Sequence, residues 1–222
     1  MRIHSRLTLG LLLALLSAPA TAGWPTVPLP EHSTGETVSR HMTYNGLPMR
    51  ASRFSTTQEV EEIVAFYARK WNGKYVVDQL EGKTIIGHAD GDHYVTVEVE
   101  PAGGGSEGTV GIVEMPAEGA KPELGKDFYR PGGTEVISDI TYHDTPNETR
   151  TLVLQNQLSP YVNQQHYLRR MRANGWSTVD SAPCLPASSQ CVGKFEKGGD
   201  RKMVVTTSRD SKMLTSTVVT IE

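Results

Sequence analysis

An internal duplication constrains the fold of this chain more than any other feature of its sequence. Residues 38–44, followed by Pro48, align without gaps on residues 136–142, followed by Pro146, and Val, Thr, Tyr and Pro recur at one fixed offset. A helical pattern follows in both copies, and Asn-Gly with an aromatic residue close behind it ends each one. Self-similarity at a fixed spacing indicates a supersecondary unit built twice. We therefore expect two copies of one small module.

The helix in the first copy is predicted over Gln58–Trp71. Val60, Ile63, Val64, Tyr67 and Trp71 fall on one face at helical spacing, and Thr56 with Glu59 has the pattern of a capping box. Asn72-Gly73 supplies the stop signal.

The helix in the second copy is predicted over residues 160–173, with Ser159 before it and Pro160 at its first position. Its apolar stripe is thinner, because Gln164 and Gln165 stand where the first copy has Ile63 and Val64. We expect this helix to pack less hydrophobic surface.

The remaining pattern favours strands, because short runs rich in β-branched residues alternate with turn residues. These runs are 85–86, 94–99, 110–113, 203–206 and 214–221. Each copy then has the order β-β-α-β-β-β. The sequence predicts an α+β fold of two tandem repeats, each an antiparallel sheet with one helix packed across a face.

Composition divides the chain into five parts. Glycine and proline punctuate the boundaries, which is typical of arms and linkers. The predicted parts are a signal peptide over residues 1–22, a proline-rich arm over 23–35, a first repeat over 36–116, a flexible linker over 117–133 and a second repeat over 134–222.

The first residues predict export. Arg2 and Arg6 make the start of the chain basic, and an apolar run of about ten residues follows. Small residues then lead up to Ala22, after which we expect cleavage by a signal peptidase. That run is too short to span a bilayer, and no later segment approaches the roughly 20 apolar residues that a membrane helix needs. There is no cysteine near the cleavage site, so the sequence predicts no lipid anchor. The sequence thus predicts a periplasmic or secreted bacterial protein without a membrane span.

Cys184 and Cys191 are the only cysteines, and we expect them to form a local disulfide in an oxidising compartment. A zinc site needs about four ligands, and no histidine stands at finger-like spacing from this pair. The C-x-x-C spacing of redox proteins is absent too.

The best candidate for a chemical site is the cluster of His88, Asp90, Asp92 and His93, which offers nitrogen and carboxylate ligands for a metal. Its Asp-Gly sequence is also typical of a hairpin turn. Because adjacent strand residues point to opposite faces, Asp92 and His93 would not readily share one ion. Both interpretations stay open, and no cofactor is predicted.

Other motifs have structural interpretations. Residues 103–108 match a dinucleotide-binding pattern, but strands are predicted on both sides where a helix should follow, so we expect a hairpin loop. The basic end of the second helix could bind an anion or could complement the helix dipole; it comprises His166, Arg169, Arg170 and Arg172. The acidic start of the first helix has the mirror-image explanation; it comprises Glu59, Glu61 and Glu62. No nucleophile motif is present.

The chain resembles small α+β modules of bacterial envelope proteins in three features. These are the helix pattern at Val60, Val64, Phe66 and Tyr67, the Asn-Gly-Trp of residues 174–176, and the strands that follow each. The arrangement also resembles the duplicated helix-grip domains of an accessory lipoprotein in the outer-membrane β-barrel assembly machinery. This chain departs from that family by lacking a lipidation cysteine, and the resemblance carries no catalytic residue.

These observations favour a non-catalytic periplasmic binding or assembly module that contacts another protein of the cell envelope. A formal net charge of −3 gives no indication of nucleic-acid binding. Two alternatives stay open: a metal-dependent enzyme centred on the His88–His93 cluster, and a carrier with a small-ligand pocket between helix and sheet.

Overall fold

The computed structural model describes residues 23–179 and 182–222; the predicted signal peptide lies outside them. Strands make up 49% and helices 13% of the described residues. None of the described helices has the length and apolar character needed to cross a membrane. The predicted fold class is wrong: the molecule is mainly antiparallel β, and its strands form one sheet of twelve instead of two α+β repeats.

The elements follow one order in both halves of the chain, two strands, a helix and four further strands. The first half contains β1 (Ser33–Tyr44), β2 (Leu47–Thr56), α1 (Val60–Lys70), β3 (Val76–Leu80), β4 (Lys83–Asp90), β5 (His93–Ala102) and β6 (Gly105–Glu114). The second half contains β7 (Glu135–Tyr142), β8 (Thr149–Asn156), α2 (Pro160–Ala173), β9 (Ser177–Thr178), β10 (Gln190–Lys197), β11 (Arg201–Arg209) and β12 (Thr215–Ile221).

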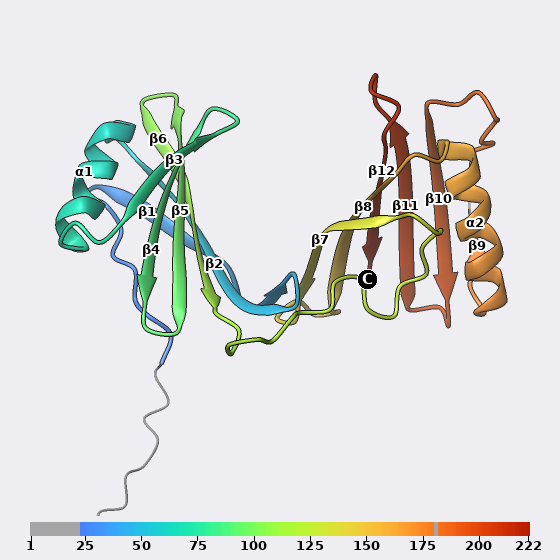
Figure 1. Ribbon diagram of the computed structural model, residues 1–222, viewed down its shortest axis with the longest axis horizontal. Coiled ribbons are helices and arrows are strands. Elements are labelled where there is room, and N and C mark those ends of the chain that lie inside the picture. Colours follow the sequence, from blue (N-terminus) through green and yellow to red (C-terminus); the bar gives the residue numbers. More distant parts are fainter. Residues whose placement is uncertain (1–22, 180–181) are drawn as a thin grey trace, which may run out of the picture.

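The sheet is continuous because β1 pairs with β7, which explains the error in the predicted fold class. The strand order is β3-β4-β5-β6-β2-β1-β7-β8-β12-β11-β10-β9, with each half contributing six neighbouring strands (Figure 1). Only three residue pairs form the β1–β7 ladder, from Met42 opposite Tyr142 to Tyr44 opposite Ile140. The local patterns of β1 and β7 predict two strands, but they do not predict that these strands pair with each other.

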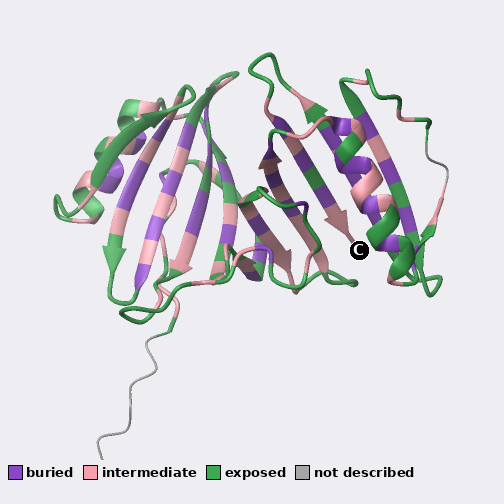
Figure 2. Ribbon diagram, turned by 45° about the vertical axis from the view of Figure 1, so that its right-hand side comes forward, coloured by how far each residue is buried: buried purple, intermediate pink, exposed green. Residues whose placement is uncertain are grey.

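Both helices lie on the same face of the sheet. Met42 is opposite Met49 of β2 on one side and Tyr142 of β7 on the other, and residues opposite each other point to the same face. Phe54, an odd number of residues after Met49, points to the α1 side. Thr149 of β8 is opposite Tyr142, and Leu152, three residues later, points to the other face, which is the α2 side. The opposite face, which we call the open face, carries no helix (Figure 2).

The core of the first half lies between α1 and strands β2, β4, β5 and β6. Ile63 and Tyr67 of α1 are fully buried against Ile86, Val97 and neighbouring valines. Complete burial of such side chains stabilises the fold by roughly 1.5–3 kcal/mol each.

The predicted helix in the first half is found, but its predicted cap is wrong. Glu59 is the N-cap, and its backbone N–H donates to the carboxylate of Glu62 at 2.9 Å. Thr56 ends β2 instead, where its hydroxyl accepts a hydrogen bond from the Gln58 N–H and donates to Glu31 O at 3.0 Å.

The second core contains polar as well as apolar groups. Tyr167, Met171, Phe195 and Val205 are buried in it. The first turns of α2 also bury Asn163 and Gln164, which form hydrogen bonds to the β8 end and to the Val192 carbonyl. The helix begins at Pro160, and the hydroxyl of Ser159 accepts from the Val162 N–H at 3.2 Å, as the sequence predicts.

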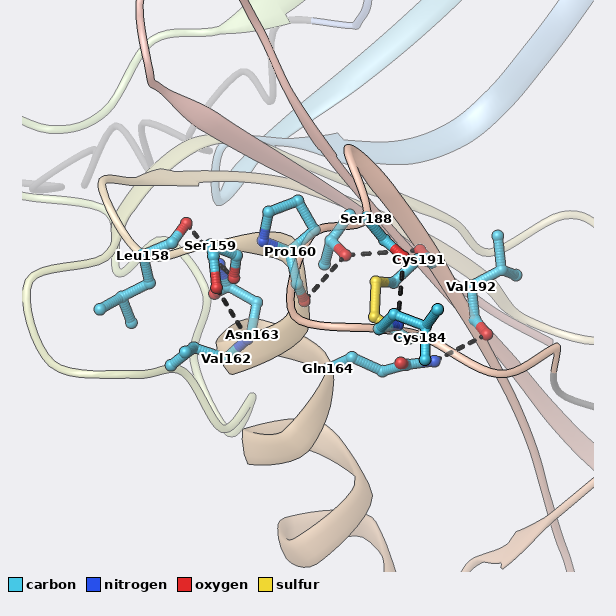
Figure 3. Close-up of a disulfide and its surroundings, with 12 residues drawn as sticks. Leu158, Ser159, Pro160, Val162, Asn163, Gln164, Cys184, Ser188, Cys191 and Val192 are labelled. Atoms are coloured by element: carbon cyan, nitrogen blue, oxygen red, sulfur yellow. Dashed lines mark hydrogen bonds between the residues drawn. A yellow bond between two sulfur atoms is a disulfide. The ribbon is translucent and has the colours of Figure 1, made fainter.

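The predicted disulfide between Cys184 and Cys191 is present, with the two Cα atoms 5.4 Å apart. It joins the loop before β10 to the second residue of β10, beside the N-terminal end of α2 (Figure 3). The Thr207 hydroxyl lies 3.3 Å from Pro160 O and 3.4 Å from Cys191 O, so it connects the same corner to β11. A disulfide fits an oxidising compartment outside the cytosol.

The predicted arm and linker both pack against the protein. Val27 and Leu29 of the arm cover the first core, and the Tyr67 hydroxyl donates to Pro28 O at 3.1 Å. Phe128 of the linker covers the second core, with its ring 5.8 Å from that of Tyr167.

A buried ion pair lies beside the β1–β7 junction. Asp139 accepts two hydrogen bonds from Arg150, at 2.9 and 2.7 Å, and one from Gly125 N at 2.9 Å. Burial alone would raise the pKa of Asp139, but the hydrogen bonds from Arg150 and Gly125 and the charge of Arg150 outweigh it and lower that pKa. Asn45, in the turn after β1, donates its N–H to Asp139 O at 2.7 Å and thereby connects this site to the first half.

Candidate binding surface

The structure places His88, Asp90, Asp92 and His93 around the hairpin between β4 and β5. Asp90 and His93 are opposite each other at the end of this ladder, and Asp92 lies in the turn between them. Within residues 23–179 and 182–222, no group of three or more His, Cys, Asp or Glu side chains lies close enough together to hold a metal ion. The geometry therefore gives the metal hypothesis no support.

The two histidines of that hairpin contact aromatic rings. His88 stacks on Trp71, with ring centroids 4.6 Å apart and planes 10° from parallel, and its Nδ1 lies 2.5 Å from Lys74 O. His93 is buried, with its ring 4.9 Å from that of Trp24 in the N-terminal arm. Both side chains thus help to close the edge of the first core.

The other motifs lie in structural positions. Gly103 and Gly104 form the tight turn between β5 and β6, as predicted for a hairpin. Among the basic residues of α2, Arg170 lies over the ring of Tyr129, with 5.8 Å from its Cζ to the centroid. Burial, and then the charges of Arg170 and Arg169, lower the pKa of His166. The charged form of His166 is therefore disfavoured beside these arginines.

The open face of the second half carries two rows of uncharged β-branched side chains. Val153, Val218, Thr206 and Val192 are opposite one another across four strands. Thr151, Thr220 and Val204 form a parallel row. We call these seven residues the threonine–valine patch, and Lys194 of β10 borders it opposite Val204. Val218 is 40% exposed and Val204 38%, and the other five residues are partly exposed, so the patch faces solvent although it has the composition of a sheet core.

The open face of the first half is charged and hollowed. A hollow of about 430 Å³ lies across β1, β2, β4, β5 and β6. Lys83 lies 3.4 Å from Glu100 and 3.8 Å from Glu98, and Arg53 pairs with Glu36. The lining residues are Thr34, Gly35, Glu36, Arg53, Phe54, Ser55, Lys83, Glu98, Glu100, Glu107, Gly108 and Thr109. This hollow is not the pocket expected for a carrier, because most of its lining side chains lie on the side of the sheet away from α1.

No family model, curated protein or solved structure matches this chain. The resemblance to envelope modules therefore stays a prediction, and function has to be argued from the surfaces of the molecule.

The sequence contains a signal for the threonine–valine patch. Alternation in β8, β11 and β12 separates one buried set of residues from one exposed set, and the exposed set is made of threonine and valine with few charges. A half-exposed strand normally places charged or strongly polar residues outward. Periodicity alone does not show which side the helix covers, so the patch becomes evident only once α2 is placed.

Proposed function

We propose that this protein is a non-catalytic binding module of the bacterial cell envelope that docks a partner protein on the threonine–valine patch. The observation that carries the proposal is the uncovered face of β8, β12, β11 and β10, where uncharged threonine and valine side chains form two rows that Lys194 borders. The centre of a protein interface is depleted in charge and enriched in apolar surface. An exposed apolar patch of this kind marks an interaction site more often than a catalytic one.

The site favours a protein partner over a small ligand. A small-molecule site is concave and buries most of its ligand, whereas the patch lies across the outer surface of four sheet strands. Its rigid, hydrogen-bonded strands present side chains in fixed rows, which lowers the entropy cost of association. The neighbouring disulfide is consistent with an exported protein, and the periplasm is the compartment that we propose.

Site-specific photo-crosslinking tests this function. A photoreactive residue replaces Val218 in the patch and, as a matched control, Val162, which is a 43% exposed valine on α2. Both proteins are expressed in their native cells and irradiated. We expect one defined partner to crosslink at position 218 and not at 162. The same products from both positions, or none from position 218, would contradict the proposal.

A further inference from the structure

The strand β3 forms one free edge of the sheet and is exposed along its whole length (Figure 2). Val76 is 61% exposed, Val77 45% and Leu80 62%. Apolar side chains at an unpaired edge favour pairing with a further strand. The opposite edge differs, because β9 is only two residues long.

The backbone of β3 offers hydrogen-bonding groups to such a strand. Glu81 and Gly82 form a two-residue hairpin turn with positive φ at both positions, and Leu80 is opposite Lys83. In this type of hairpin, hydrogen-bonded pairs alternate outward from the turn, so Leu80, Asp78 and Val76 bond to β4. The backbone groups of Val77 and Gln79 therefore point away from the sheet.

One of these outward groups already has a partner within β3. The Gln79 N–H donates to the Asp78 carboxylate at 2.8 Å. The N–H and C=O of Val77 and the C=O of Gln79 have no partner among the described residues. Natural edges are commonly protected by lysine, proline or a bulge, and β3 contains none of these.

The charges around this edge select the partner. Asp78 and Glu81 are exposed, and Glu98 and Glu100 share the single cation of Lys83 on the same side as Leu80. Residues 36–116 contain twelve acidic and seven basic side chains. A second copy of β3 centred on Asp78 would place two carboxylates directly opposite each other, which destabilises a sheet. A basic segment meets no such repulsion.

We infer that β3 binds an extended basic segment of another protein as a thirteenth strand. Val77 would contact apolar side chains of that segment on the α1 side of the sheet, and Val76 and Leu80 would contact them on the open face. Main-chain hydrogen bonds supply affinity in such strand addition, and side chains supply specificity. The edge lies in the first half, away from the threonine–valine patch, so either site can fail its test independently.

The test uses the mature protein and a fluorescent peptide probe that alternates valine with lysine and threonine. Val77→Pro removes an N–H that β4 does not use, so the fold should survive while strand addition is lost. Val77→Thr is the matched control, because it changes the side chain and keeps the N–H. We expect fluorescence anisotropy to show binding to wild type and Val77→Thr and at least roughly tenfold weaker binding to Val77→Pro.

A charge reversal provides a second readout if Val77→Pro does not fold. Asp78→Lys should weaken binding of the lysine probe and strengthen binding of a probe in which glutamate replaces lysine. Equal binding of the lysine probe to wild type and both the Val77→Pro and Asp78→Lys variants would overturn the inference. No binding to wild type at about 1 mM would also overturn it. A dimer of the free protein that dissociates in Val77→Pro would show that a second copy occupies the edge instead.

Discussion

The two halves of the molecule use the same order of elements but differ in how the helix is attached and in what the open face presents. In the first half, α1 places Ile63 in an apolar core, and the open face is charged. In the second half, α2 places Gln164 at the aligned position, and the open face carries the threonine–valine patch. Polar contacts have replaced part of the apolar packing beneath α2, whereas apolar surface has been left on the outside.

The two halves attach their helices by different contacts, and this difference affects how precisely α2 is positioned. Buried amides such as Asn163 and Gln164 gain little net free energy from their hydrogen bonds, because each bond replaces one to water. They do specify one position of α2, since a displaced helix would leave buried polar groups without partners. A precisely positioned helix behind β10 and β11 would keep the exposed face of those strands flat. Such a face fits the docking that we propose for the threonine–valine patch.

The largest expected effect comes from truncating the aligned helix positions. Ile63→Ala should lower the free energy of unfolding by about 2–4 kcal/mol, since the side chain is fully buried. Gln164→Ala should cost only about 1 kcal/mol, mainly from the unpaired Val192 carbonyl. Urea unfolding measures both values. Equal losses would show that the two helices are attached in the same way.

The ion pair beside the junction should have the next largest effect. Arg150→Leu leaves the carboxylate of Asp139 without its partner and should cost about 2–3 kcal/mol at pH 7. The pKa of Asp139 is lower in the folded protein than in the unfolded one. The pair therefore stabilises the fold above the unfolded pKa of about 4 and loses this effect as pH falls below it.

Thermal unfolding at several pH values measures this dependence. The difference in Tm between wild type and Arg150→Leu should be largest near neutral pH and should shrink below about pH 4. A difference that stays constant into the acid range would mean that Arg150 acts through packing and not through the charge of Asp139.

Removing the disulfide should have a smaller and more local effect. The loop it closes is short, and the chain-entropy model gives about 2 kcal/mol for Cys184→Ser combined with Cys191→Ser. Hydrogen exchange should rise in β10 and at the start of α2 and should stay unchanged in β4 and β5. A uniform rise in both halves would contradict the separation of the two cores.

The smallest effect on stability is expected in the patch itself. Val218→Lys places a charge at a 40% exposed position and should change the free energy of unfolding by less than about 0.5 kcal/mol. Urea unfolding checks this value. A larger loss would mean that Val218 contributes to the core, and the patch could then not be regarded as free surface.

Local structure was more predictable from the sequence than the overall arrangement. The start of α2 at Pro160 follows from Ser159 and from the fixed φ of proline, which suits a first helical position. The short apolar runs lie in strands, except that Leu214 precedes β12. The disulfide follows from two cysteines in a chain that the sequence predicts to be exported. These features depend on neighbouring residues, and their physical causes are visible in the sequence itself.

The overall arrangement depends on contacts between distant residues. The fold class was wrong because the pairing of Met42 with Tyr142 joins segments about one hundred residues apart, and no local pattern requires it. The cap of α1 was wrong because Thr56 continues β2, so Glu59 became the first available cap. The threonine–valine patch requires knowledge of which face the helix covers. His88 was a reasonable ligand candidate in sequence, but Trp71 stacks on it only in the folded chain.

The most direct test of this account compares a charge on each open face. Val218→Lys in the second half and Thr109→Lys in the first half both lie on exposed strand positions of that face. Each variant is expressed in its native cells, crosslinked and purified, and the recovered partner is quantified against wild type. The account predicts that Val218→Lys loses the partner that crosslinks to position 218, while Thr109→Lys retains it. Retention by Val218→Lys, or equal loss from both variants, would contradict the assignment of docking to the second half.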